Sequence, residues 1–400
     1  MTEKSSSAYI LSPYGKHTRL VTRLVSAVLL TCLGCIDPYA PDLLSIDYGI
    51  LVVDGFFVPN DTTRIRLSRT VTMDSPENSA PEPLADVKIE GDNGFSITLS
   101  QHAGQLYTAP PMSVDRTARY KMSIQTADGK TYESNYIPIN ASPPIDSILI
   151  HEGSDSVAVT FNVFAHDLEN DARYYSYQYD ETWEYTAYGY SVYKYENGVI
   201  VPRKRADELF TCYKTRKSSD IRLTSTARLS DDVVYDYPVL EMRESDRRLY
   251  HAYSLNVRQY VLTADAYKYW SIVNKNSEEL GTLFDPIPSQ PSGNFTCISD
   301  PNQPVIGFFS ASYVSTKRIL VKRAELSGPQ ELYQPTGYER CSEIFVPLKD
   351  MSEEKLQGML LIDRVYDRVT FELIGYKVSE AFCLDCRLMG GTTKRPSYWR

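Results

Sequence analysis

Short β-strand patterns separated by turn residues fill the region from residue 50 to residue 137. The alternating or β-branched runs predict strands at 50–58, 64–71, 87–89, 95–99, 105–108, 120–126 and 130–137. Asn93-Gly94 and Asp128-Gly129 each stand between two such runs, and these dipeptides favour hairpin turns because both residues tolerate a positive φ. About seven short strands within roughly ninety residues predict an immunoglobulin-like β-sandwich over residues 49–140.

Paired prolines mark the predicted domain boundary. The segment Ala141-Ser142-Pro143-Pro144 interrupts the strand pattern, because each proline biases the preceding residue toward extended backbone. Alternating runs resume at 145–150 and 157–165. We therefore predict a mainly β chain of two tandem immunoglobulin- or fibronectin-III-like sandwiches, at 49–140 and 145–400, joined by a linker at 141–144.

The second sandwich is expected to carry three additions. Asn197-Gly198 predicts the turn of a long tyrosine-rich hairpin, inserted at one end of the sheet. Thr263 is positioned to cap a helix that runs to about residue 280 and ends at Gly281. The tail after Tyr376 contains a Cys-x-x-Cys pair, Cys383 and Cys386.

The cysteines favour disulfides over metal or redox chemistry. A zinc ribbon needs a second Cys-x-x-Cys pair, which the predicted mature chain lacks, and a redox dithiol is expected to open a helix within a βαβ unit. We expect Cys341 to bond one cysteine of the tail pair, and the remaining connectivity is left open. No metal or cofactor is expected. The disulfide candidates are Cys212, Cys297, Cys341, Cys383 and Cys386.

The amino-terminal segment predicts export and lipid attachment. Basic residues precede a short apolar run that begins at Leu24, and Gly34 stands directly before Cys35. The run is too short to span a bilayer as a helix. We predict a lipoprotein signal peptide at 1–34, an acylated Cys35 and a tether at 35–48. The alternative is ordinary secretion, with Cys35 as a disulfide partner.

Net charge limits the classes of partner. The chain carries a formal charge of −9 at pH 7, and the predicted signal peptide is itself basic, so the mature chain is more acidic still. Nucleic-acid binding relies on clustered Lys and Arg, so we expect no nucleic-acid partner. Contact with a membrane is expected to come from lipid rather than from a basic patch.

Tyrosines supply the candidate contact residues. The chain has 31 tyrosines and 13 phenylalanines, and tyrosine combines apolar area with a hydroxyl group. Tyr175, Tyr177 and Tyr179 would share one face of a strand, which either binds a ligand or packs in the core. We expect Trp183, which lies between Glu181 and Glu184 in the sequence, to be buried. The candidate ligand or partner contacts are Tyr188, Tyr190, Tyr193, Tyr195, Trp183 and Trp270.

Several longer blocks resemble a known family. They are Glu181-Thr-Trp-Glu-Tyr185, Ala266-Tyr-Lys-Tyr-Trp270, Leu283-Phe-Asp-Pro-Ile-Pro288, Ser292-Gly-Asn294, Val305-Ile-Gly-Phe-Phe-Ser-Ala311, Cys383-Leu-Asp-Cys-Arg387 with Gly390-Gly391 and Trp399, and Cys35-Ile-Asp-Pro-Tyr39. Together they are similar to the domain of unknown function four-two-four-nine family. The resemblance covers nearly the whole mature chain. It implies a non-enzymatic, surface-facing outer-membrane lipoprotein of Bacteroidetes-type bacteria, often encoded beside TonB-dependent transporters, and it transfers no catalytic residue.

Three functional hypotheses follow. The first is a binding or accessory subunit of a TonB-dependent outer-membrane receptor, acting in ligand capture or as a lid. The second is a structural or assembly role in the envelope without a small ligand. The third is a hydrolase of surface glycans, which requires two carboxylates facing each other across a groove. The sequence contains no His-Glu-x-x-His, no Gly-x-Ser-x-Gly and no phosphate-binding glycine loop, so we expect a non-enzymatic protein.

Overall fold

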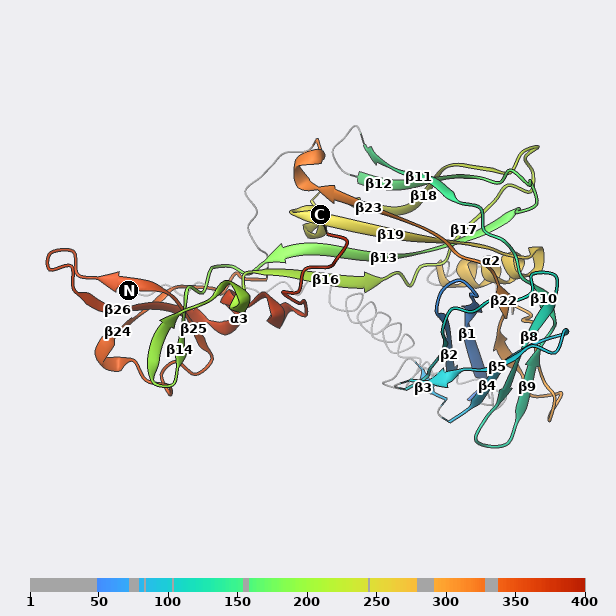
Figure 1. Cartoon of the computed structure of the whole chain (residues 1–400), viewed down its shortest axis with the longest axis horizontal. Coiled ribbons are helices and arrows are strands. Elements are labelled where there is room, and N and C mark those ends of the chain that lie inside the picture. The colour runs from blue at the N-terminus through green and yellow to red at the C-terminus, as the bar shows by residue number, and fades with distance from the viewer. Residues whose placement is uncertain are drawn as a thin grey trace, which may run out of the picture. The chain divides into compact units, whose positions relative to one another are not determined.

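The computed structural model describes residues 49–71, 79–82, 84–102, 104–153, 158–243, 245–278, 291–327 and 337–399. The predicted signal peptide, Cys35 and the tether lie outside the described residues. The architecture is mainly β (Figure 1).

Two sheets pack face to face to form the first sandwich. One has the strand order β21-β1-β2-β7-β6, with β22 beside β1 and β3 beside β2; the other has the order β20-β9-β8-β4-β5, with β10 beside β8. Buried side chains from both sheets form one core, which includes Leu51, Ile65, Val87 and Tyr120. The strands are β1 (Leu51–Phe57), β2 (Thr63–Arg69), β3 (Ala80–Pro81), β4 (Asp86–Gly91), β5 (Ser96–Thr98), β6 (Ser100–Gln101), β7 (Leu106–Ala109), β8 (Arg119–Gln125), β9 (Thr131–Ser134), β10 (Ile137–Pro138), β20 (Phe295–Cys297), β21 (Val305–Gly307) and β22 (Ser310–Ala311).

The alternation of apolar and polar residues along the strands, and the residue types in the turns, explain the local structure of the first sandwich. In β2, Ile65 and Leu67 are fully buried, whereas Arg64 and Arg66 point to solvent. Gly94, in the turn between β4 and β5, and Gly129, in the turn between β8 and β9, have φ values of +85° and +83°. Those turns need residues that adopt the left-handed region readily, which is why glycine occupies them.

A late segment of the chain completes the first sandwich. β21 and β22 pair in parallel with β1, and β20 pairs antiparallel with β9. The sequence assigned residues 295–311 to the second sandwich; the structure differs because β1 and β9 are otherwise unpaired on one side. Asn294 fixes this segment, since its Nδ2 donates to the Phe309 carbonyl at 2.9 Å and its Oδ1 accepts from the Phe309 amide at 2.7 Å.

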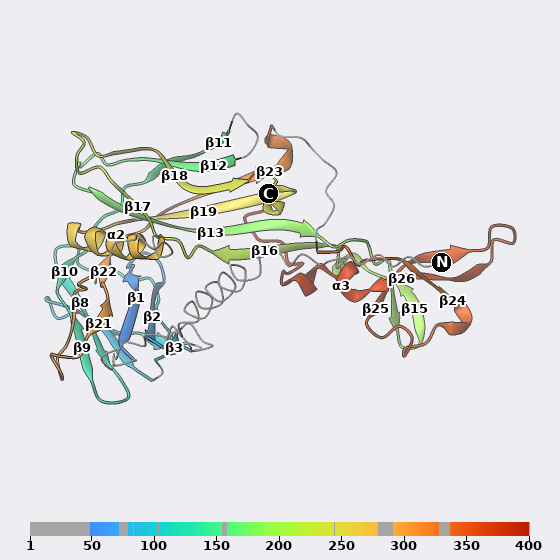
Figure 2. The same ribbon diagram turned by 180° about the vertical axis from the view of Figure 1, so that it is seen from behind.

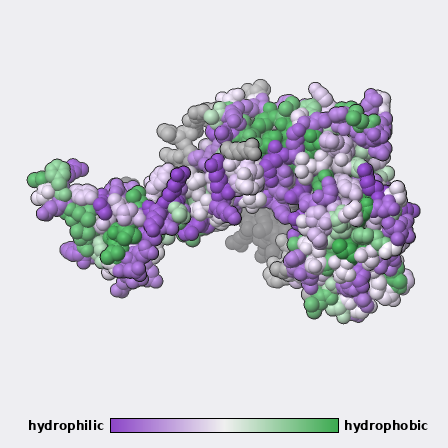
Figure 3. Space-filling view, viewed as in Figure 1, coloured by the Kyte–Doolittle hydropathy of each residue, from purple (hydrophilic) through white to green (hydrophobic). Residues whose placement is uncertain are grey.

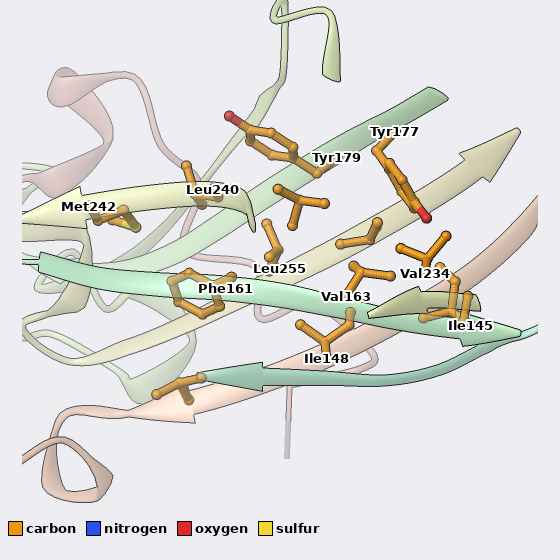
Figure 4. Packing of buried hydrophobic residues seen from close by; sticks show 14 of the residues in the cluster. Ile145, Ile148, Phe161, Val163, Tyr177, Tyr179, Val234, Leu240, Met242 and Leu255 are labelled. Carbon is orange, nitrogen blue, oxygen red and sulfur yellow. The ribbon is translucent and has the colours of Figure 1, made fainter. Parts of the chain in front are cut away.

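The second sandwich has a three-stranded and a five-stranded sheet. The strand orders are β11-β12-β18 and β16-β13-β19-β23, with β17 beside β13. Figure 4 shows Phe161, Val163 and Leu240 from the first of these sheets facing Tyr177 and Leu255 from the second. The strands are β11 (Ile145–Glu152), β12 (Ala158–His166), β13 (Tyr174–Thr186), β16 (Thr211–Lys217), β17 (Arg222–Ser225), β18 (Val233–Arg243), β19 (Ala252–Val261) and β23 (Ser315–Lys322).

Helix α2 (Ala264–Glu278) follows β19. Thr263 Oγ1 accepts a hydrogen bond from the Ala266 amide at 3.2 Å, which is the expected cap. Buried Ala266 and Tyr269 pack in a cluster with Phe56 of β1 and Tyr260 of β19, and the last two rings stack at 4.7 Å. The linker at 141–144 is also fixed, because Gln259 Nε2 donates to the Pro143 carbonyl at 2.8 Å.

A fifth sheet, which we call the C-terminal sheet, has the order β15-β14-β25-β26-β24 (Figure 2). The predicted tyrosine hairpin is its β14–β15 pair, which joins β25 rather than extending the second sandwich. Val346, Leu361, Tyr376 and Val378 form its small core. The elements of this region and the remaining short helices are β14 (Tyr193–Glu196), β15 (Val199–Pro202), β24 (Ile344–Pro347), β25 (Met359–Tyr366), β26 (Leu373–Glu380), α3 (Ala381–Leu384), η1 (Arg205–Asp207), η2 (Arg247–Leu249), η3 (Arg323–Glu325), η4 (Leu348–Asp350) and η5 (Cys386–Met389).

Candidate functional site

The tyrosines of β13 belong to the core of the second sandwich. Tyr175 and Tyr177 are fully buried, and Tyr179 is nearly so. The Tyr175 hydroxyl donates to Asp232 Oδ2 at 2.7 Å, and the Tyr177 hydroxyl donates to Gln259 Oε1 at 2.9 Å. Burial, together with nearby carboxylates, raises the pKa of Tyr179 to about 12. Trp183, further along the same strand, packs partly buried against this core. This face therefore presents no ligand surface.

Two predicted contacts, Tyr188 and Tyr190, are exposed in the segment between β13 and β14. The Tyr190 ring stacks on Phe210 with a centroid separation of 3.6 Å. Tyr193 is half-buried, because its ring meets Tyr376 edge-on at 5.8 Å while the Arg364 guanidinium lies 4.8 Å from its centroid. Of the four hairpin tyrosines, Tyr195 alone lines either of the two cavities described below.

The cavity at Tyr195, which we call the hairpin cavity, has a volume of about 630 Å³. This volume lies within the range typical of small-molecule sites. One wall comes from β14 and the residue after β15, and the other from the chain that leads into β25. The lining residues are Lys194, Tyr195, Arg203, Glu353, Glu354, Leu356, Gln357, Met359, Leu360 and Leu361.

Hydrogen bonds hold the first wall of the hairpin cavity in place. The Arg203 amide donates to the Val192 carbonyl at 2.7 Å, and Arg203 Nη2 lies 3.2 Å from Ser191 Oγ. Ser191 Oγ in turn donates to the Leu361 carbonyl at 2.9 Å, which ties the wall to β25. Burial lowers the pKa of Arg203.

Trp270 lies on α2, in a different part of the chain. Its ring meets Tyr269 edge-on at 5.2 Å, and it packs against the cluster that contains Phe56 and Tyr260. Tyr269 lines a second cavity of about 880 Å³, between α2, β10 and residues 292–294. The structure therefore does not bring Trp270 together with the hairpin tyrosines.

The tail is stapled by two disulfides. Cys341 bonds Cys383, which matches the expectation that Cys341 pairs with one cysteine of the tail pair, and Cys212 of β16 bonds Cys386. Cys297 of β20 is a buried free thiol. It sits in the core of the first sandwich, away from any cysteine partner in the described part of the chain.

A buried charge network lies at the other end of the aromatic strand. The fully buried carboxylate of Glu181 accepts hydrogen bonds from Arg216, Arg248 and the Tyr253 hydroxyl. Every partner of this carboxylate comes from the core or its rim, so the network is a structural element. The alternation of β13 puts Glu181 on the same face as Tyr175, Tyr177 and Tyr179, but its three partners from three other segments could not be read from spacing.

Comparison with known protein families identifies the family of this chain. The family model for a domain of unknown function, DUF4249, matches residues 36–318. The chain belongs to this family. No curated protein matches it.

The DUF4249 match covers the first sandwich, the second sandwich as far as the middle of β23, the β14–β15 hairpin and Arg203, and it stops before β24. The second wall of the hairpin cavity, residues 353–361, therefore lies outside the matched region of this DUF4249 chain. Sequence reasoning found Tyr195 but missed this wall, because the charged stretch at 353–357 lacks any motif.

The described residues of this DUF4249 protein contain no group of three or more His, Cys, Asp or Glu side chains placed to hold a metal ion. Among the same residues, no helix has both the length and the apolar character needed to cross a bilayer.

Proposed function

We propose that this protein is an outer-membrane lipoprotein, anchored through Cys35, that serves as a binding and accessory subunit of a TonB-dependent transporter. The anchor is supported by the basic leader and by the short apolar run that ends in Gly34-Cys35. The transporter is supported by the family resemblance. The protein acts by binding, and no residue is assigned a catalytic role.

The observation that carries the proposal is an apolar surface on the C-terminal sheet. Hydrophobic residues gather over this sheet in the space-filling view (Figure 3). Exposed apolar side chains concentrated in one region favour a partner surface. The exposed apolar residues of this region, which together we call the apolar surface, are Ile344, Phe345, Leu348, Tyr366, Val369, Phe371 and Ile374.

The most exposed part of the apolar surface is the turn between β25 and β26. Val369 is 85% exposed and Phe371 is 79% exposed. Asp367 Oδ1 accepts hydrogen bonds from the amides of Val369 and Thr370, both at 2.8 Å, and these bonds give the turn a defined backbone conformation. Phe371 has a φ of +56°, a backbone conformation that bulky side chains rarely adopt. A turn that holds a strained aromatic residue in solvent favours a contact role.

Co-purification tests the proposal. The full chain is tagged at its carboxyl terminus, expressed in its native host and extracted in a mild detergent. We expect a TonB-dependent barrel protein to co-purify with it. We also expect mass spectrometry of the amino-terminal peptide to find an acylated Cys35. Recovery of the chain without a barrel protein, or with an unmodified Cys35 thiol, would contradict the proposal.

A paired set of variants locates the contact. Val369→Ser combined with Phe371→Ser removes the apolar turn, and we expect recovery of the barrel protein to fall at least about tenfold, as when a few central apolar residues supply most of a binding energy. Leu168→Ser is the control, because Leu168 is 87% exposed on a loop of the second sandwich. It should leave recovery unchanged. Equal losses in both variants would show that the apolar turn is not the contact.

A further inference from the structure

Opposite charges line the hairpin cavity without pairing with each other. Arg203 stands on the β15 wall, and Glu353 and Glu354 stand on the wall that leads into β25. Within the described residues, no ion pair joins the arginine to either glutamate, although all three line the same space. The cavity therefore holds an arginine on one wall and, on the other, two carboxylates with which it does not pair.

Arg203 is a cation with incomplete solvation. Its Nε is buried without an acceptor in the described part of the chain, and its Nη2 is bonded to a neutral hydroxyl, Ser191 Oγ. The neighbouring cation, Lys194, is already neutralised by Glu196 at 3.1 Å and Asp207 at 3.2 Å. The carboxylates of Asp207 and Asp385 lie near enough to act on the charge of Arg203, but neither forms a hydrogen bond with its guanidinium. A partly desolvated guanidinium without a hydrogen-bonded carboxylate gains from an anionic ligand, because charge-assisted bidentate hydrogen bonds are the strong ones.

The opposite wall selects against a simple anion. Glu353 and Glu354 are exposed side chains with no ion-pair partner among the described residues. They would repel a sulfate or phosphate group and attract an ammonium group. Between the charged walls, Leu356 and Leu361 are buried and line the cavity together with Met359. The hairpin cavity thus offers a cationic end, an anionic end and an apolar floor.

We propose that the hairpin cavity binds a short zwitterionic peptide. The peptide carboxylate lies at Arg203, the terminal ammonium lies at Glu353 and Glu354, and apolar side chains rest on the floor. Tyr195 and Gln357 line the same space and supply a hydroxyl and an amide for the peptide backbone. This inference rests on the ligand-capture part of the proposed function and names the class of ligand.

Calorimetry with capped peptides tests the charge assignment. The full chain in detergent is titrated with Ala-Leu-Ala, with its N-acetyl form and with its C-terminal amide. We expect the free tripeptide to bind with a dissociation constant below 1 mM. Each cap should weaken binding about tenfold, since each removes one charge-assisted contact. Absence of binding by the free tripeptide, or binding that neither cap changes, would overturn the proposal.

Variants that remove charge test which wall of the hairpin cavity each peptide terminus contacts. In Arg203→Gln the amide cap should have no further effect, while the acetyl cap still weakens binding. In Glu353→Gln combined with Glu354→Gln the pattern should reverse. Arg368→Gln, at the turn between β25 and β26, is the control and should behave as the parent chain. The double glutamate variant alters only exposed side chains, so it remains informative if Arg203→Gln is poorly folded. If each cap weakened binding by the same factor in the parent chain and in all variants, the assignment of the peptide termini to the two walls would be overturned.

The outcome is separable from that of the transporter proposal. Peptide binding is measured on the isolated chain, whereas transporter association is measured by co-purification. A chain that co-purifies with a barrel protein but ignores the tripeptide would refute the peptide site alone. A chain that binds the tripeptide but brings no barrel protein would refute the transporter assignment alone.

Discussion

Glu181 and Arg216 meet through two hydrogen bonds to a single carboxylate oxygen, with Nη2 at 2.7 Å and Nε at 2.9 Å from Glu181 Oε2. The other oxygen, Oε1, accepts a hydrogen bond from the Tyr253 hydroxyl at 2.8 Å and contacts Arg248 Nη1. Asp246 holds Arg248 from the opposite side, with its Oδ2 at 2.7 Å from Nη2. A carboxylate that is fully buried is therefore completely paired.

Glu181→Gln should destabilise the second sandwich strongly. The amide keeps the shape of the side chain but leaves Arg216 and the mostly buried Arg248 with Asp246 as the one remaining carboxylate of the network. Removing one partner of a buried pair costs about 3 kcal/mol. Arg216 is more than half exposed, so Arg216→Ala should cost only about 1 kcal/mol. Urea denaturation followed by tryptophan fluorescence measures both free energies of unfolding. Equal losses of unfolding free energy in Glu181→Gln and Arg216→Ala would show that burial of the altered side chain does not set the cost.

Removal of the Cys212–Cys386 bond should cost more stability than removal of Cys341–Cys383. The first closes a loop of 174 residues and the second a loop of 42. Loop-closure entropy predicts about 5 and about 4 kcal/mol respectively. The double serine variant of each pair is compared by thermal unfolding. Cys297→Ala is the control, because it leaves both disulfides intact and should shift the midpoint least.

Asn294→Ala should loosen the late segment from the first sandwich. The substitution removes both hydrogen bonds to the Phe309 backbone and leaves a buried carbonyl and amide unsatisfied. We expect a loss of about 2 kcal/mol. Hydrogen exchange should accelerate in β21 and β22, while β12 and β18 keep their protection. Unchanged exchange in β21 would contradict the role of Asn294.

Acid should weaken the fold through His251 near pH 6. Burial lowers the pKa of this histidine, and the charge of Glu184 only partly opposes the shift. The unfolded chain therefore binds a proton near pH 6.5 that the folded chain does not bind. Stability contributed by the neutral ring is present at pH 7.5 and falls as the pH drops below about 6.5. Urea midpoints at several pH values measure this slope.

The matched variants are His251→Gln and His102→Gln. The first should flatten the slope between pH 7.5 and pH 5.5, whereas the second alters an exposed histidine and should leave it unchanged. His166 acts in the opposite direction, because its hydrogen bond to Asp146 raises its pKa. The difference between the parent chain and each variant isolates His251. A slope that both variants share with the parent chain would contradict this assignment.

Local signals predicted much of the fold. The turns at Asn93-Gly94, Asp128-Gly129 and Asn197-Gly198 connect neighbouring strands in the structure, because the turn and the alternation depend only on nearby residues. The Thr263 cap was predicted for the same reason. The pairing of β21 with β1 could not be predicted, since a parallel partner some 250 residues away carries no local signal.

The candidate site was predicted only in part. Tyr195 was identified because it belongs to a conspicuous aromatic hairpin. Arg203 and Glu353 are ordinary charged residues in sequence, and their significance comes from two distant segments that line one cavity. The tyrosines of β13 posed the reverse problem. A stripe of rings fits a binding face or a core equally well, and only the opposing sheet decides between them.

The placement of β20, β21 and β22 has a consequence for biogenesis. As the chain leaves the ribosome, β1 and β9 emerge early, but the strands that cover their open edges follow only at residues 295–311. Until then, each early strand offers unpaired backbone groups to any other chain nearby. The first sandwich therefore cannot be completed until most strands of the second have been synthesised.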